Sequence, residues 1–402
     1  VSRAELQHEL AVAAYDRAIA LYGEIFTDNF STDDVFRYLQ TLEAAGITQG
    51  IVGNTRKARR HYERQLMIAS ERAAKEPDNL DWQRQRSVSF NRIGNVLAVQ
   101  NNIGAALVAY RNGFTVLESL IATDPTRDDW QLDLAVSHIK IGDMLAAQGD
   151  TDGAIAVYRE SLGIYERLAA DDPTSSGRQR DVAASKMRLG NAQLAKGEAV
   201  RAQQQYRDAF GIFETLAEDE TTNLDAQFDL SIAYEKIGDV LVGQGSASEA
   251  LGSYRDGLRI VERLVASSPA NTQWQYAVSI FSKKIGQGLL SAGDDVQAMK
   301  SIQSALAVLK RLAAIDPAND KWGYELAVAQ SRFGDALIAS GDTDRGLAAY
   351  RDGFAITESL AANDPADSGL QRDLFAFWIK IGRVQLGRGQ NDDALTSYRE
   401  GL

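Results

Sequence analysis

The sequence predicts an all-α solenoid of about eight helical hairpins, each stacked on the next. Three observations lead to this fold class. A repeat of 48 residues runs along the chain without insertion or deletion, proline is confined to one position of that repeat, and apolar residues recur every three or four positions in between. A fixed period of this kind is typical of repeat proteins, in which each unit buries its apolar faces only by stacking on its neighbours.

Glycine marks the period most clearly. It recurs every 48 residues, at Gly46, Gly94, Gly142, Gly190, Gly238, Gly286, Gly334 and Gly382. A tyrosine follows the glycine after sixteen residues in every repeat except the sixth, which has Ile302. An alanine lies four residues before that position in every repeat except the seventh, which has Gly346. Several columns therefore keep one period over eight units.

Proline shows where the helices end. The chain has six prolines, and all six fall in one column: Pro77, Pro125, Pro173, Pro269, Pro317 and Pro365. Because proline breaks helices, its confinement to one phase predicts that the rest of each repeat is helical. A second break lies seven residues after the marker glycine, where glycine or asparagine suits a left-handed helix cap: Gly53, Asn101, Gly149, Gly197, Gly245, Gly293, Gly341 and Gly389.

Each repeat is therefore expected to hold two helices, here called helix A and helix B. In the third repeat they are expected over roughly 130–148 and 151–170. Side-chain oxygens just before helix B are placed to cap its free amides, at Asp150, Ser246, Asp294 and Asp342. Four tryptophans share the start of helix A, and we interpret them as packing between repeats rather than as ligand clamps: Trp82, Trp130, Trp274 and Trp322.

The predicted organisation has two parts. Residues 1–33 are expected to form an N-terminal cap or a degraded repeat, with one amphipathic helix over 4–26. Residues 34–402 are expected to form the solenoid of eight repeats, the last one truncated. Because an array that stops within a helix B has no polar cap, we expect the native protein to continue past Leu402.

The marker glycine, the turn glycine, the alanine and the tyrosine stand at offsets 0, +7, +12 and +16, and this pattern resembles the core of the tetratricopeptide repeat. The usual period of that family is about 34 residues. The additional residues here are expected to lengthen both helices at the ends away from the tight turn. The resemblance covers about residues 34–402. It implies a right-handed superhelix whose helices A line a concave, partner-binding surface.

Composition excludes several classes of function. The net charge of −12, without a basic cluster, argues against nucleic acid as a partner. No stretch approaches the roughly 20 apolar residues of a membrane helix. The absence of cysteine excludes disulfides and fits a reducing compartment, so we expect a cytoplasmic protein. The three histidines, His8, His61 and His138, are far apart in sequence. We therefore expect no metal site, no cofactor and no catalytic residues, and hence no enzyme.

One polar strip is the candidate site. A cation stands two residues before the marker glycine, and an amide or carboxyl group usually stands one residue after it, so the two are neighbours on helix A. The strip is expected either to face a ligand groove or to form a ladder of ion pairs along and between repeats. The sixth repeat adds Lys283 and Lys300, which suggests a local basic patch. The candidate partner-binding residues are Arg92, Asn95, Lys140, Asp143, Arg188, Asn191, Lys236, Asp239, Lys283, Lys284, Gln287, Arg332 and Asp335.

The predicted function is a scaffold or sensor that binds a peptide or protein partner in the concave groove. As an alternative, the chain is the ligand-sensing regulatory region of a larger bacterial signalling or defence enzyme. In similar arrays the effector is a nucleotide-binding switch, a TIR domain, a caspase-like protease or a kinase. The partner, the flanking domains and the oligomeric state stay open.

Overall fold

The computed structural model describes residues 3–25, 30–219, 223–317 and 319–401. Within these ranges the chain forms seventeen α-helices and no strand. The predicted continuation past Leu402 and the last residue of the predicted N-terminal helix lie outside them. That helix is present as α1 (Arg3–Ile25), which packs on α2 through a stacked pair of rings, Tyr22 and Tyr38, with centroids 4.8 Å apart.

The remaining helices alternate as the repeat predicts. The helices A are α2 (Thr32–Ile51), α4 (Leu80–Val99), α6 (Asp128–Ala147), α8 (Ser176–Ala195), α10 (Leu224–Gly243), α12 (Thr272–Ser291), α14 (Asp320–Ala339) and α16 (Ser368–Gly387). The helices B are α3 (Thr55–Lys75), α5 (Ile103–Thr123), α7 (Thr151–Asp171), α9 (Ala199–Asp219), α11 (Ala247–Ser267), α13 (Asp295–Ile315), α15 (Thr343–Asn363) and α17 (Asn391–Glu400).

The tight turns between helix A and helix B have the predicted left-handed backbone. The seven turn glycines have φ between 74° and 86°, and Asn101, which replaces glycine in the second repeat, has φ of 56°. Asp150, Asp294 and Asp342 cap the following helices by accepting a hydrogen bond from a first-turn amide. Ser246 makes no such bond, so that part of the capping prediction is wrong.

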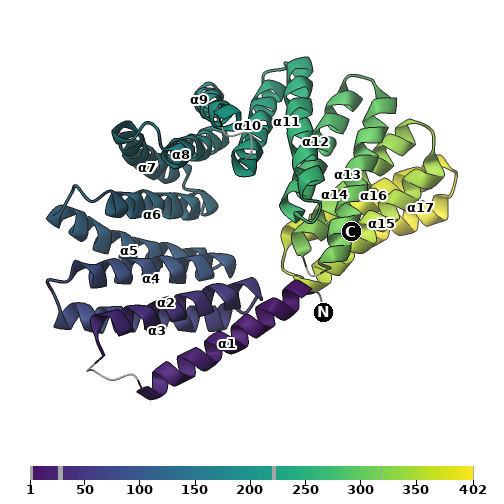
Figure 1. The fold of residues 1–402 in the computed structure, drawn as a ribbon. Helices are drawn as coiled ribbons and strands as arrows, with labels where there is room; N and C mark the ends of the chain where they lie inside the picture. Colours follow the sequence, from purple (N-terminus) through teal and green to yellow (C-terminus); the bar gives the residue numbers. More distant parts are fainter. Residues whose placement is uncertain (1–2, 26–29, 220–222, 318, 402) are drawn as a thin grey trace. The chain divides into compact units, whose positions relative to one another are not determined.

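The chain divides into two compact units, residues 1–209 and 210–402, and the division falls within α9. The first unit holds α1 to α8 and the first half of α9. The second unit holds the rest of α9 and α10 to α17. Within each unit consecutive helices pack against one another as antiparallel neighbours (Figure 1).

The marker glycine lets helix A and helix B approach closely. In the third repeat, a Cβ added to Gly142 of α6 would lie 2.5 Å from Cε1 of Tyr158 in α7. The tyrosine ring thus occupies the space that a side chain would need, which explains why the two columns keep a fixed separation of sixteen residues. The sixth repeat follows the same rule, because Ile302 covers Gly286 there.

Candidate functional site

The polar strip lies along the helices A, and its amide or carboxyl group accepts a hydrogen bond from the tyrosine of the same repeat. The oxygen-to-oxygen distances lie between 2.6 and 2.8 Å. The pairs are Tyr110–Asn95, Tyr158–Asp143, Tyr206–Asn191, Tyr254–Asp239 and Tyr350–Asp335. Burial raises the pKa of Tyr110 to about 12, so its hydroxyl stays protonated and remains a donor at neutral pH.

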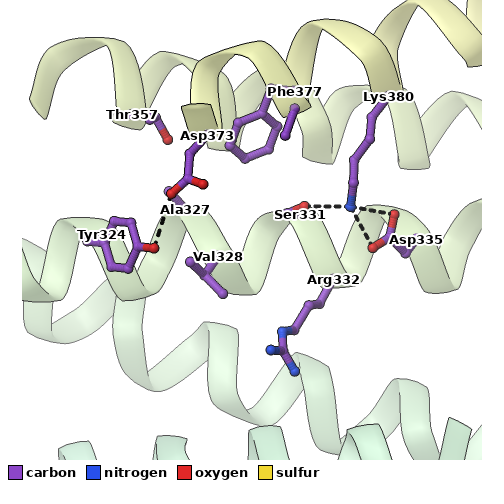
Figure 2. A pocket seen from close by; sticks show the side chains of 11 residues that line it. Tyr324, Ala327, Val328, Ser331, Arg332, Asp335, Thr357, Asp373, Phe377 and Lys380 are labelled. Carbon is purple, nitrogen blue, oxygen red and sulfur yellow. Dashed lines mark hydrogen bonds and ion pairs between the residues drawn. The ribbon is translucent and has the colours of Figure 1, made fainter. Parts of the chain in front are cut away.

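The cation column reaches back to the preceding repeat. Arg92 of α4 lies 2.5 Å from Glu43 of α2, and Arg332 of α14 donates to Gln287 of α12 at 2.5 Å. Lys284 of α12 pairs with Asp239 of α10 and, at 3.0 Å, with Glu235 of α10. Lys380 of α16, seen at close range in Figure 2, lies 2.7 Å from Asp335 of α14.

These contacts join residues about 45 positions apart, so they link repeats rather than neighbouring turns of one helix. Along a single helix A, the described part of the strip has one pair at ion-pair distance, Lys236 with Asp239 at 4.0 Å. The strip therefore forms links mainly between repeats. In these links the cation of one repeat binds a carboxylate of the preceding repeat or, for Arg332, the amide of Gln287.

Three cations of the strip have no carboxylate within ion-pair distance in the described ranges, and of these Arg332 has the Gln287 amide, whereas Lys140 and Arg188 have no side-chain partner. Lys140 of α6 and Arg188 of α8 are partly buried, and no carboxylate in the described ranges lies within ion-pair distance of either. The guanidinium of Arg188 donates to the carbonyl of Ala184 at 3.4 Å.

Lys284 and Lys380 each pair with an aspartate 45 residues earlier in the sequence. The residue 45 positions before Lys140 is Asn95, whose amide is neutral. Lys140 and Arg188 both belong to the first unit.

The basic patch expected in the sixth repeat is divided between two helices. Lys283 and Lys284 lie on α12, and both are paired, Lys283 with Glu325 of α14 at 2.5 Å. Lys300 is exposed on α13. Of the two lysines that the sixth repeat adds, Lys283 is thus neutralised by a carboxylate of the neighbouring helix A.

A cavity of about 260 Å³ opens between α14 and α16 in the second unit. Its floor includes Ala327, Phe377 and the buried Thr357, and its rim carries the Tyr324–Asp373 hydrogen bond of 3.1 Å together with Lys380 (Figure 2). Sequence reasoning missed this cavity. The signal lies in the column of Thr357, because five other repeats carry a larger apolar side chain there: Leu117, Tyr165, Phe213, Val261 and Leu309.

A partly buried carboxyl group in the first unit makes stability depend on pH. Burial raises the pKa of Asp181 on α8, and the nearby charges of Arg180 and Arg188 only partly oppose this. The folded chain therefore binds this proton up to a higher pH than the unfolded chain does. The stability that this bound proton contributes is fully present below the pKa of Asp181 in the unfolded chain. It is lost as the pH rises through the pKa of Asp181 in the folded chain.

Asp181→Asn is therefore expected to stabilise the chain at about pH 7, and the gain is expected to shrink toward about pH 4. Urea unfolding of the two proteins at both pH values measures the difference. Asp208→Asn, at an exposed position of α9, is the control and should change little at either pH. An Asp181→Asn variant that is less stable at pH 7 would contradict the assignment.

The chain has three histidines, and we expect none of them to take part in catalysis or metal binding. His61 lies in α3 and His138 in α6, and burial lowers the pKa of both. The side chain of His8 is not among those described. No group of three histidine, aspartate or glutamate side chains in the described part of the chain could hold a metal ion. None of its helices is long and apolar enough to cross a membrane.

Comparisons with known proteins agree with the repeat. Residues 139–174 match the family model of the tetratricopeptide repeat. No curated protein matches the chain. Among solved structures, aspartyl phosphate phosphatase F from Bacillus subtilis is 12% identical with a TM-score of 0.53, and the match covers 98% of this chain and 91% of that one. The apo form of RapI is 14% identical with a TM-score of 0.53, over 81% of this chain and 99% of that one.

A third similar structure belongs to a larger protein. It is a signal transduction ATPase with numerous domains and a tetratricopeptide repeat sensor, from Pyrococcus horikoshii. It is 11% identical with a TM-score of 0.55, and the match covers 97% of this chain and 52% of that one. At such identities the likeness concerns the fold alone. Residues 139–174 thus match the tetratricopeptide repeat, and the chain has the fold of a tetratricopeptide-repeat array.

Proposed function

We propose that the chain is a non-catalytic scaffold that binds a peptide or protein partner along its helices A. In the first unit, acidic groups of that partner bind Lys140 and Arg188. The observation that carries the proposal is the contrast within one column. Arg92, Lys284 and Lys380 each hold a carboxylate of the preceding repeat. Lys236 lies near two acids of its own helix, and Arg332 donates to Gln287. Lys140 and Arg188 have no side-chain partner in the described chain.

The contrast matters because a partly buried cation loses part of its hydration. Elsewhere in the column a carboxylate or, for Arg332, the Gln287 amide compensates for that loss, but no side chain of the described chain pairs with Lys140 or Arg188. A partner carboxylate would supply the missing pair and would gain charge-assisted hydrogen bonds. Asn95 and Asn191 lie in the neighbouring column of the strip and can bond to the peptide backbone of the partner.

The test is selection of peptides on the immobilised chain from a random displayed library. We expect the bound peptides to be enriched in aspartate and glutamate, and their affinity to fall as salt rises. In Lys140→Gln/Arg188→Gln, a synthetic peptide of the selected sequence should bind at least about tenfold more weakly by fluorescence anisotropy.

The matched control is Arg159→Gln/Arg207→Gln. It removes the same number of charges from the same two repeats, but at exposed positions of the helices B. It should leave the affinity within about twofold. Enrichment of neutral peptides that bind both double variants equally well would overturn the acidic-partner proposal.

The alternative, a sensor region within a larger signalling protein, is supported by the Pyrococcus horikoshii structure, which also carries a tetratricopeptide repeat sensor beside further domains. The two possibilities are distinguished by the complete reading frame on both sides of this segment. A nucleotide-binding, TIR, protease or kinase domain in that frame would favour the sensor, and a frame that holds repeats alone would favour the scaffold.

A further inference from the structure

One repeat carries an arginine in a column that is otherwise apolar or aromatic. Arg86 lies on α4, eight residues before the marker glycine. At the same position the other seven repeats have Tyr38, Leu134, Val182, Leu230, Val278, Leu326 and Leu374. The arginine therefore replaces a packing residue of the array.

The structure gives Arg86 little compensation for this position. The side chain is partly buried, its Nε is buried without a hydrogen-bond partner, and no carboxylate of the described chain lies within ion-pair distance. Its one hydrogen bond runs from Nη1 to Oε1 of Gln83 at 2.5 Å. Burying a guanidinium in this way costs free energy that an apolar residue in the same column would not cost.

Gln83 also departs from the behaviour of its column. In three other repeats the equivalent glutamine donates its Nε2 to the carbonyl of the proline that precedes helix A, at 2.6 to 3.5 Å: Gln131, Gln179 and Gln275. In the second repeat the amide turns to Arg86 instead, and its Nε2 has no partner among the described residues. A guanidinium and an amide group are thus both available as donors, side by side.

These two donors line a cavity of about 390 Å³ between α4 and α5. One part of its wall is apolar and consists of Pro77, Leu80, Val116 and Leu120. The other part carries the hydroxyls of Thr115, Ser119 and Thr123, which donate to carbonyls of their own helix and so present free acceptor lone pairs. A volume of this size lies near the lower end of the range of small-molecule sites.

We propose that this cavity binds a small organic acid. Its carboxylate accepts hydrogen bonds from Arg86 and Gln83, and its carbon skeleton packs on Leu80, Val116 and Leu120. A monocarboxylate fits better than a phosphate, because a single guanidinium neutralises one negative charge and half of the wall is apolar. The site does not depend on the partner-binding face, since it uses none of the residues of the polar strip.

Isothermal titration of the whole chain with butyrate, benzoate and inorganic phosphate tests the proposal. We expect saturable binding of at least one carboxylate, with one site per chain, and weaker binding of phosphate. Arg86→Leu should weaken the carboxylate at least about tenfold, because the charge-assisted bonds are lost. The same variant should keep or raise Tm, because four other repeats have leucine at the position equivalent to Arg86.

Arg111→Leu is the matched control, since it removes the same charge from an exposed position of α5 in the same repeat and should leave carboxylate binding unchanged. Three results would overturn the proposal. They are the absence of saturable carboxylate binding, binding by Arg86→Leu that equals the parent's, and a fall in Tm larger than that of Arg111→Leu. The last result would make Arg86 a structural residue. Binding of phosphate alone would overturn the assignment to a carboxylate.

Discussion

Gly142→Leu is expected to lower the free energy of unfolding by about 3 kcal/mol, because the leucine overlaps a ring that cannot move aside. Its Cβ alone would lie 2.5 Å from Cε1 of Tyr158. That ring is 5% exposed, and its hydroxyl is held by Asp143 at 2.7 Å. To remove this overlap, either the buried tyrosine ring must take a new position or α6 must move away from α7. Both changes lose packing contacts between the two helices.

Urea unfolding followed by far-UV circular dichroism measures the loss. The control is Gly163→Leu in α7 of the same repeat, where an added Cβ meets nothing within 4 Å. There leucine replaces a poor helix former at an exposed position and should stabilise the chain by about 0.5–1 kcal/mol. If both variants lost the same stability, the effect would belong to glycine in helices generally rather than to this close approach.

The helices and turns could be predicted from the sequence because the signals that end them are local. In the third repeat the expected helices, 130–148 and 151–170, agree within two residues with Asp128–Ala147 and Thr151–Asp171. Proline removes a backbone donor, and glycine permits a left-handed turn, whatever the rest of the chain does. The period then placed the same breaks in every other repeat.

The partners of the polar side chains could not be predicted in the same way. Spacing on one helix suggested that Lys284 would face its own neighbour, Gln287, but the structure pairs Lys284 with Asp239 of the preceding repeat. That choice depends on the register between stacked helices A, which no local pattern specifies. The cavity beside Thr357 likewise results from side-chain volumes on two helices of different repeats.

The Arg86 site lies between these two cases. The exception was visible in the aligned columns of the repeat, because one arginine stands among apolar residues. What the sequence could not show is that no carboxylate of the described chain lies within ion-pair distance of Arg86 and that Gln83 turns away from the loop to meet it. Columns aligned by the repeat thus locate candidate positions, and the structure decides which of them lack an internal partner.

Trp82→Ala is expected to cost about 3–5 kcal/mol, because it empties the largest side-chain volume at the junction of the first two repeats. Trp82 is fully buried, and its ring stacks on Phe36 of α2 with centroids 4.2 Å apart and an interplanar angle of 6°. Its Nε1 donates to Glu76 at 2.8 Å, and this bond is the main cause of the lowered pKa of that carboxyl group. The contacts agree with packing between repeats as the role of Trp82.

Because repeat arrays can unfold in steps, the loss is best measured by amide hydrogen exchange along α2, α3 and α4 together with the global transition. Trp82→Phe separates the two contributions, since it keeps a ring against Phe36 but removes the donor to Glu76. Trp322→Ala is the matched control, because Trp322 holds the equivalent position in the seventh repeat but is partly exposed. It should therefore lose much less. Equal losses of stability at the two positions would mean that burial at the repeat junction does not determine the effect. If amide protection fell only within α4, the ring would stabilise its own helix rather than the packing between repeats.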